Sequence, residues 1–340
     1  MKMNSLKKKV NLILVLIGSL VLALAGCSDG NSAAEGEGAK KDNYKPVPNN
    51  ITLASGPIGG GWYQTGASVA EILMKEIPGL NVTVIEGGSE SNIRDVANGS
   101  AHIGYTFSDS INDAVNGAGV FEDGAIGNVS GIASLYTSYY QAFAVENSKY
   151  DTFKDLSKGA HLLPGMKNWG GELVTKAILK HYDVSYKDIE KNGGKVSYTT
   201  FGDMPSLLAD GHADVAMGIT AAPSSMVMEL NALKGVKFLE VPKEIAEDIQ
   251  KNNAGFIPAQ LPANTYEGQK EPVDTLASYS VIFASNDLPE ELVERISRAI
   301  VENKDELIKN NEPMKDFKEE DILKGFKGVP IHPGAEKVYE

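Results

Sequence analysis

The stretch ITLASGPIGGGWYQTG, residues 51–66, decides the fold prediction. Its first five residues form a short apolar segment typical of a strand, and the glycines that follow predict a tight turn. Apolar residues at helical spacing then run from Gly66 to Ile77, where Pro78 and Gly79 end the pattern. Strand, glycine-rich turn and helix in this order predict the opening unit of an α/β fold.

The same order of elements returns in the middle of the chain. The first unit continues with strands at 82–86 and 103–107 and with a helix that opens at 87–92. The second unit has strands at 160–163, 196–201 and 215–219, a glycine and tryptophan turn at 164–171, and a helical face over 174–181. Gly99 and Gly211 occupy matching positions in the two units, as do Val84 and Val196. Two units of alternating strand and helix predict two lobes, each with a parallel sheet, although such short patterns also recur by coincidence.

The remaining apolar segments are expected to connect the two lobes. Strands are predicted at 132–136, 140–145 and 275–284, and a helix is predicted from Glu290 to about Asn310. We assign that helix to the first lobe, which makes the lobe discontinuous in sequence. The predicted division is therefore 49–138 with 286–340 for the first lobe, and 139–285 for the second.

The first 26 residues have the pattern of a bacterial lipoprotein signal peptide. Lysines among residues 1–9 precede an apolar run at 12–25, and small residues then lead into Cys27, the single cysteine. A helix over that run is roughly 21 Å long, which is short for a bilayer core of about 30 Å. We expect Cys27 to be the lipidated first residue of the mature protein and 27–48 to be a flexible tether; an uncleaved anchor helix is the alternative. Both place the folded part outside the cytoplasm, on the outer face of the cytoplasmic membrane.

Composition excludes several classes of protein. A hydrophobic content of 42% is that of a globular chain, and the net charge of −13 argues against a nucleic-acid partner. A single cysteine excludes a disulfide framework and cysteine-rich zinc sites. The five histidines form no metal-binding pair, and no Gly-x-Ser-x-Gly motif occurs. We therefore predict no enzyme, no metal and no cofactor.

The glycine-rich turns are candidate anion sites. A helix that begins after such a turn presents unpaired backbone N–H groups at the positive end of its dipole, which suits a carboxylate or phosphate. Gly56 to Gly61 has P-loop spacing but is followed by Trp62 instead of lysine, so a nucleotide is not indicated. The alternative is that the glycines only make tight turns. The chain has three arginines, at positions 94, 295 and 298, so an arginine clamp is not expected.

Several ordered blocks together resemble the TAXI family of solute receptors of TRAP (tripartite ATP-independent periplasmic) transporters. The blocks are 51–66, 87–94, 107–109, 221–223, 257–259, 265–269 and 331–335. The resemblance covers residues 49–340 and implies a type II periplasmic-binding-protein-like fold, two α/β lobes with a ligand cleft at the hinge. It implies capture of a small carboxylate or an amino acid, such as glutamate or glutamine, and delivery to TRAP membrane subunits. The turn at 165–171 is bulkier than in the family and carries Lys167.

The predicted ligand site combines the turns of both lobes with the strand ends beside them. It comprises Ser55, Gly60, Gly61, Trp62, Tyr63, Ser89, Ser108, Asp109, Tyr136, Lys167, Asn168, Trp169 and Ala222. The acid group of the ligand is expected on the N–H groups that follow the first turn, and Asp109 is expected to accept an ammonium group if the ligand is an amino acid. A strand-end aspartate also commonly caps a helix. Three alternatives remain: a receptor for an ATP-driven (ABC) importer, an extracytoplasmic sensor lipoprotein, and an enzyme of the same fold.

Overall fold

The computed structural model describes residues 44–56, 58, 60–315 and 317–340. The predicted signal peptide, Cys27 and almost all of the tether lie outside these residues, so those calls stay predictions. Residues 44–340 form one unit in the contact pattern of the chain. Among the described residues, no helix has both the length and the apolar character needed to cross a bilayer.

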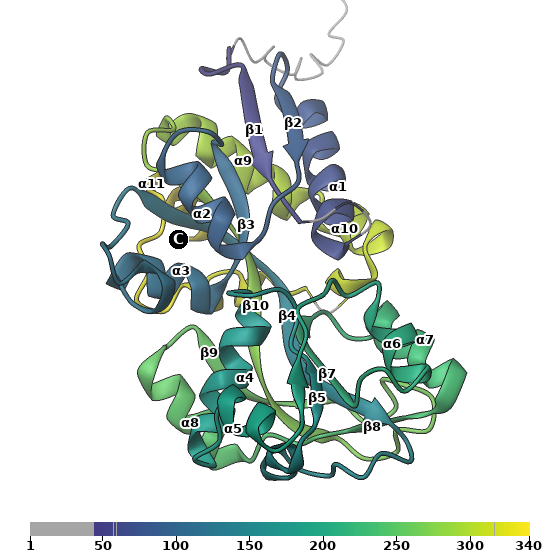
Figure 1. Cartoon of the computed structure of the whole chain (residues 1–340). Helices are drawn as coiled ribbons and strands as arrows, with labels where there is room; N and C mark the ends of the chain where they lie inside the picture. The colour runs from purple at the N-terminus through teal and green to yellow at the C-terminus, as the bar shows by residue number, and fades with distance from the viewer. Residues whose placement is uncertain (1–43, 57, 59, 316) are drawn as a thin grey trace, which may run out of the picture. The chain divides into compact units, whose positions relative to one another are not determined.

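All the strands of the described chain belong to one mixed sheet with the order β2-β1-β3-β10-β4-β7-β5-β6 (Figure 1). β8 pairs with β4 and β9 pairs with β10, beside this path. The strands are β1 (Asn50–Ala54), β2 (Asn81–Ile85), β3 (Ile103–Phe107), β4 (Val129–Val145), β5 (His161–Leu163), β6 (Lys195–Val196), β7 (Val215–Thr220), β8 (Val236–Phe238), β9 (Phe256–Leu261) and β10 (Val273–Ser285).

The two predicted units form the two ends of this sheet. β1 lies between β2 and β3 and is parallel to both, and β5 lies between β6 and β7 and is parallel to both. The turn before the third strand has the same backbone in each unit: Gly99 has φ 82° and Gly211 has φ 74°, which favour glycine. The predicted two-lobed α/β fold is therefore confirmed. β6 is shorter than the predicted strand at 196–201, because it can pair only with the three-residue β5.

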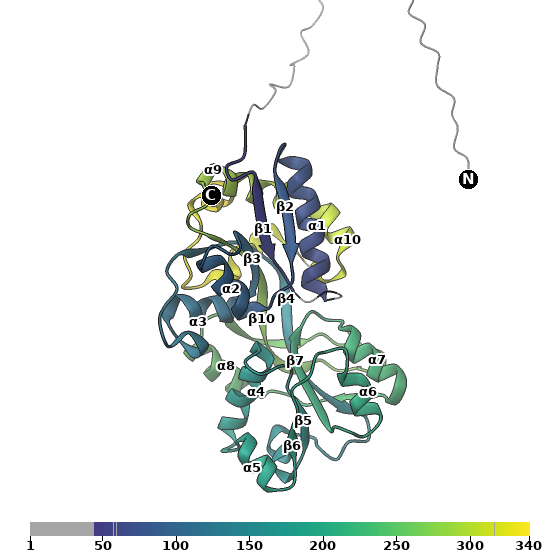
Figure 2. The same cartoon turned by 45° about the horizontal axis from the view of Figure 1, so that its top comes forward.

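Two long strands run through both lobes (Figures 1 and 2). The two strands predicted at 132–136 and 140–145 are one strand, β4, which pairs with β10 up to Tyr139 and with β7 from Tyr139 on. β10 pairs with β9 up to Ser278 and with β3 from Ser280 on. We call residues 138–139 and 278–280 the hinge. The predicted lobe boundaries at residues 138 and 285 stay a prediction.

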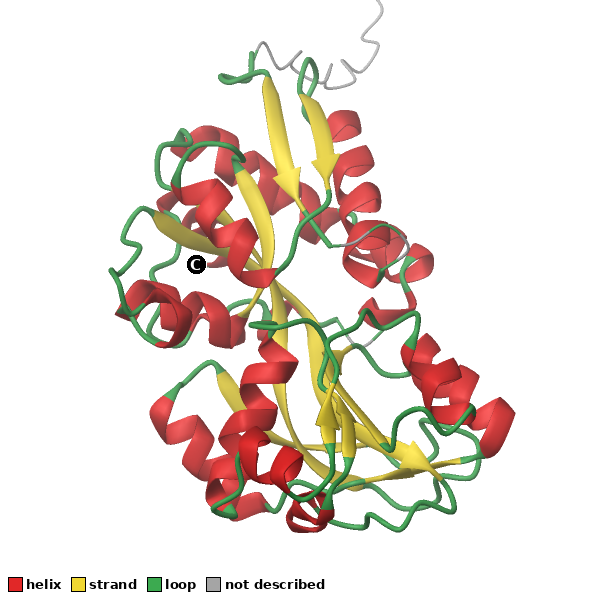
Figure 3. Ribbon diagram, in the orientation of Figure 1, coloured by secondary structure: helices red, strands yellow, loops and turns green. Residues whose placement is uncertain are grey.

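Helices cover both faces of the sheet in each lobe (Figure 3). They are α1 (Gly61–Glu76), α2 (Ser89–Ala97), α3 (Ser108–Asn116), α4 (Gly170–His181), α5 (Tyr186–Lys191), α6 (Met204–Ala209), α7 (Ser225–Lys234), α8 (Lys243–Asn252), α9 (Glu290–Glu302), α10 (Lys304–Asn310) and α11 (Pro333–Tyr339). In lobe 1, α1 and α9 pack on one face while α2 and α3 pack on the other. In lobe 2, α4 and α8 pack on one face while α6 and α7 pack on the other. The helix predicted at 290–310 is interrupted at Asn303, which ends α9.

A third connection joins the lobes at the corner between α8 and β9, residues 253–255. The side chain of Asn253 donates to the backbone carbonyl of Asp109 at 2.9 Å and to the Asp113 carboxylate at 2.8 Å. Ser108 Oγ donates to the carbonyl of Gly255 at 2.6 Å. A Cβ at position 255 would lie 2.2 Å from the Ser108 carbonyl oxygen, so this approach of two backbones requires glycine.

Candidate ligand site between the lobes

The parallel strands of both lobes end at the hinge. Phe107, the last residue of β3, pairs with Ser280, and Thr220, the last residue of β7, pairs with Tyr139. The carboxyl ends of the strands, and the helix starts that follow them, therefore face one region between the lobes. In open α/β sheets this edge is where ligands bind.

The start of α1 forms the lobe 1 side of this region. Gly60 precedes the helix in an extended conformation and no side chain caps the helix start. Ser55 is fully buried, and its hydroxyl donates to the carbonyl of Trp62 at 2.6 Å, so it holds the turn in place. Trp62 Nε1 donates to Ser280 Oγ at 2.9 Å and thereby ties the turn to the hinge. A Cβ at Gly61 would meet only the Tyr136 hydroxyl, at 4.0 Å, so packing does not require glycine there.

The two serines predicted on the next strand ends are buried and already hydrogen-bonded. Ser89 Oγ lies 2.7 Å from Thr106 Oγ1 and accepts the N–H of Phe107 at 3.1 Å. Ser108 Oγ donates to the α8–β9 corner and lies 2.8 Å from Ser278 Oγ. These hydroxyls stabilise the strand ends and the hinge.

Asp109 is the buried acid of the region. The residue is 4% exposed, and its Oδ1 accepts a hydrogen bond from Ser278 Oγ at 2.5 Å. Burial raises the pKa of the carboxyl to about 7, and the nearby Asp113 charge adds to this, while the bond from Ser278 opposes it. Near neutral pH this carboxyl can therefore either donate or accept a hydrogen bond.

The turn at 165–171 forms the lobe 2 side. Lys167 and Asn168 are exposed, and Asn168 has a left-handed backbone, φ 67°. Trp169 packs edge-on against Phe201 of its own lobe, with ring centroids 5.3 Å apart. Glu172 in the first turn of α4 is fully buried, accepts the N–H of Asn168 at 3.3 Å, and lies 2.7 Å from Lys176 Nζ.

The first residue of α4 contacts lobe 1. A Cβ at Gly170 would lie 3.8 Å from the Phe107 ring and 4.0 Å from Asp109 Oδ2. Phe107 in turn packs against Trp62, with ring centroids 4.5 Å apart. The structure thus places the first residues of α1 and α4 near one aromatic side chain, Phe107. Among the described residues, no hydrogen bond or ion pair joins Lys167 to lobe 1.

The other predicted residues lie along the hinge and its rim. Tyr136 is 7% exposed and its pKa is raised to about 12 by burial, so it is a neutral hydroxyl. Tyr63 and Ala222 are half-buried, and Ala222 precedes Pro223 in a cis peptide bond. Gln141 Nε2 donates to Thr220 Oγ1 and to the carbonyl of Ala221, which fixes this rim.

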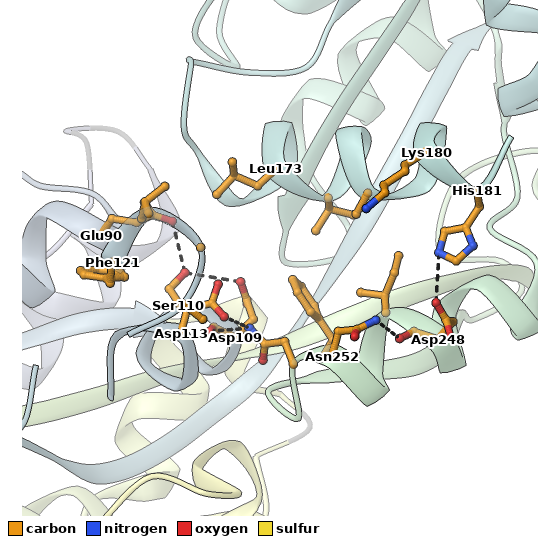
Figure 4. A pocket seen from close by; sticks show the side chains of 18 residues that line it. Glu90, Asp109, Ser110, Asp113, Phe121, Leu173, Lys180, His181, Asp248 and Asn252 are labelled. Atoms are coloured by element: carbon orange, nitrogen blue, oxygen red, sulfur yellow. Dashed lines mark hydrogen bonds and ion pairs between the residues drawn. The ribbon is translucent and has the colours of Figure 1, made fainter. Parts of the chain in front are cut away.

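A cavity of about 560 Å³ opens beside Asp109 between the lobes (Figure 4). Its lobe 1 wall includes Glu90 at the start of α2 and Asp113 on α3, and its lobe 2 wall includes Leu173 and Lys180 of α4. Its size is that of a small-molecule pocket. We call it the interlobe cavity.

Several residues of this region were not predicted from the sequence, among them Glu90, Glu172, Phe107 and Gly170. Glu90 and Glu172 stand in the first turns of α2 and α4, where an acid usually signals only a favourable charge for the helix dipole. Phe107 and Gly170 were predicted only as parts of elements. Their meeting depends on contacts between lobes that no local pattern encodes.

The three arginines lie outside the site. Arg94 donates to the carbonyl of Val120 and lies 4.5 Å from the Phe121 ring. Arg295 and Arg298 each pair with a glutamate one turn earlier on α9. An arginine clamp on the ligand is therefore not available in this structure.

The chain matches the NMT1-like family over residues 53–340. The chain belongs to this family. The match begins within β1 and takes in everything that follows, so it spans both lobes and the hinge.

Solved structures that align with this chain share little sequence with it. The periplasmic aliphatic sulphonate binding protein SsuA from Escherichia coli is 13% identical, with 86% of this chain and 78% of that one covered and a TM-score of 0.45. A TctC solute binding protein from Polaromonas is 17% identical, with 77% and 88% covered and a TM-score of 0.45. A structure from work on glutathione import via GshT and the cystine ABC importer TcyBC of Streptococcus mutans is 12% identical, with 78% and 94% covered and a TM-score of 0.49.

Proposed function

We propose that this NMT1-like protein is an extracytoplasmic solute-binding receptor of the TAXI type, which captures a small carboxylate or amino acid and delivers it to TRAP membrane subunits. One observation carries the proposal: the strand ends of both lobes converge at the hinge, where a Cβ added at Gly170 of lobe 2 would lie 3.8 Å from the Phe107 ring and 4.0 Å from Asp109 Oδ2 of lobe 1. Lipidation at Cys27 and anchoring to the membrane are part of the proposal. Receptor function requires no catalytic group.

The ligand is held by groups from both lobes. The N–H groups at the start of α1, beside Ser55, Gly60, Trp62 and Tyr63, receive an acid group. Asp109 receives an ammonium group, and Lys167, Asn168, Trp169 and Ala222 form the rim on lobe 2. A ligand that touches both lobes favours the closed state, because only that state provides all its contacts. The lobes divide at residues 138 and 285 in this proposal, and the paired strands between them bend.

Two other receptor roles use the same site. An ABC-importer receptor would share the fold and the hinge, and so would an extracytoplasmic sensor lipoprotein. Genes for a multi-helix permease beside this gene would favour the TRAP role. A neighbouring ATPase gene or a sensor kinase gene would favour the other two.

A thermal-melt screen tests whether the protein binds a small solute. A ligand at about a hundred times its Kd adds roughly 2.7 kcal/mol to the free energy of unfolding, so a true ligand raises the melting temperature measurably. The panel contains amino acids, dicarboxylates, keto acids and amines. A double variant of Gly61 and Gly170 to bulky residues is the control, because it fills the site from both sides. Absence of any shift across the panel would contradict the receptor function.

A further inference from the structure

The interlobe cavity has an acidic wall on lobe 1. Glu90, Asp109 and Asp113 line it from α2 and α3 (Figure 4). The charged groups facing them from lobe 2 are Lys180 and His181 of α4 and Asp248 of α8. His181 Nε2 lies 3.5 Å from the Asp248 carboxylate, and the exposed Lys180 is the one lysine among the described lining residues. Carboxylates therefore outnumber cations around the cavity.

Glu90 is poorly solvated and poorly partnered for a carboxylate. Apart from its own backbone N–H, its described hydrogen-bond partner is the Ser110 hydroxyl, 3.3 Å from Oε1. Burial, followed by the charges of Asp109 and Asp113, raises its pKa to about 7. A cation in the cavity would stabilise the ionised form of Glu90 and of Asp109, and a second carboxylate there would repel both.

The lobe 2 side does not supply a compensating site for an anion. Glu172 is buried at the start of α4 and takes the N–H of Asn168, so the positive end of this helix already faces a carboxylate. Gly170 at the same helix start faces Asp109. Arg94 contacts two lining residues of the cavity, since it donates to the carbonyl of Val120 and lies 4.5 Å from the Phe121 ring, whereas Arg295 and Arg298 pair with glutamates on α9.

We propose that the interlobe cavity binds the cationic end of the solute, and that Glu90 sets this preference together with Asp109 and Asp113. The solute class is then an amine-bearing molecule, such as an amino acid, and a dicarboxylate without an ammonium group is rejected. The carbon chain lies against the apolar side chains of Leu173, Ala177 and Phe121, which line the same cavity. This inference rests on the proposed receptor function.

Matched probes in the melt screen test the charge preference directly. 5-Aminopentanoate, pentanoate and glutarate share five carbons and one carboxylate, and they end in an ammonium, a methyl group or a second carboxylate. Each amino acid in the panel is likewise compared with its counterpart that lacks the amino group. Shifts confined to amine-bearing probes support the inference. A dicarboxylate that shifts the melt as much as its amine counterpart would overturn the inference and leave the receptor function standing, whereas no shift from any probe contradicts both.

Variants locate the preference in the cavity. Glu90→Gln should weaken binding of the best amine-bearing probe about tenfold, the effect of losing a charged hydrogen-bond partner. Glu122→Gln is the matched control, because Glu122 is an exposed acid of lobe 1 outside the lining. Unchanged affinity in Glu90→Gln, with a melt that shows a folded protein, would remove Glu90 from the site.

Calorimetry in two buffers of different ionisation enthalpy gives an independent readout. A cation favours the ionised form of the carboxyls, so binding at pH 6.5 should release protons from Glu90 and Asp109. The other titratable groups that line the cavity are Asp113, Lys180, His181 and Asp248. Net proton uptake on binding would contradict the proposed cation site.

Discussion

The starts of α1 and α4 occupy the same place in their lobes but differ in chemistry. At α1, the first turn of the helix carries no acidic residue, and Trp62 is fixed to the hinge through Ser280. At α4, the buried Glu172 takes a backbone N–H group, and Trp169 packs within its own lobe. In both turns a backbone N–H ahead of the helix donates to a glutamate, Ile58 to Glu86 at 2.9 Å and Asn168 to Glu172 at 3.3 Å, but only at α4 does that glutamate stand in the first turn of the helix itself. We therefore expect the two helix starts to contact different groups of the ligand.

Glycine substitutions in the first turn of α4 test how closely the start of this helix packs against the sheet of lobe 2. A Cβ at Gly171 would lie 2.9 Å from the Gly218 Cα, a backbone atom of β7, so Gly171→Ala should cost about 3 kcal/mol in the free energy of unfolding. At the neighbouring Gly170 the nearest atom would be 3.5 Å away, so Gly170→Ala should stay within about 1 kcal/mol of the parent. Urea unfolding measures both. Equal losses of stability in the two variants would show that α4 shifts to accommodate the added methyl group and that packing does not fix the start of this helix.

The lobe 1 side contains Asp109, a buried acid with a raised pKa, whose titration a pH series can detect. The pKa of Asp109 is raised to about 7, so the folded state holds its proton more tightly than the unfolded state does. Stability is therefore lost as pH rises from about 4 to 7, and Asp109→Asn should recover about 2 kcal/mol at pH 8 and almost nothing at pH 4. The stability of the Asp109→Asn variant should still fall in part as pH rises, because the pKa of Glu90 is raised in the same direction. A loss of stability at pH 8 would show that the bond with Ser278 outweighs the buried charge.

The smallest effects on stability are expected at two positions where the lobes use different residues to accept a hydrogen bond from a strand N–H group. In lobe 1, His102 Nδ1 accepts the N–H of Thr52 at 3.1 Å, and in lobe 2 the Asp214 carboxylate accepts the N–H of His161 at 2.7 Å. Removing either acceptor leaves a strand N–H unpaired, so His102→Ala should cost about 1 kcal/mol and Asp214→Ala slightly more. Asp214→Asn keeps an acceptor and serves as the control. A negligible loss in both alanine variants would mean that water replaces these acceptors.

The sequence predicts most of the fold because its strands are short and well delimited. β1, β2 and β3 begin and end within one residue of the predicted bounds, since glycine, proline and asparagine flank them. β4 was predicted as two strands because Thr137 and Ser138 interrupt its apolar run. Ser138 is nevertheless buried, since its hydroxyl meets Ser280 on β10, a partner 142 residues away. Only the assembled sheet supplies that partner.

The candidate site stays a prediction, and the structure shows which of its details the sequence could not provide. Trp62 packs against Phe107, and a Cβ added at Gly170 would lie 3.8 Å from the same ring. Whether a serine hydroxyl faces a ligand or the protein depends on residues far along the chain. Ser108 finds its partner at Gly255, and Ser89 finds its partner at Thr106. Residue type alone does not reveal this choice.

The α8–β9 corner has a consequence for how the molecule moves. Two adjacent strands, β4 and β10, resist bending weakly and also permit the lobes to twist. Hydrogen bonds from Asn253 to α3 attach lobe 2 at a third point, and three attachment points that do not lie on one line oppose both twisting and opening of the lobes. Separation of the lobes should therefore require the bonds from Asn253 to Asp109 and Asp113 to break, at the same corner that lines the interlobe cavity.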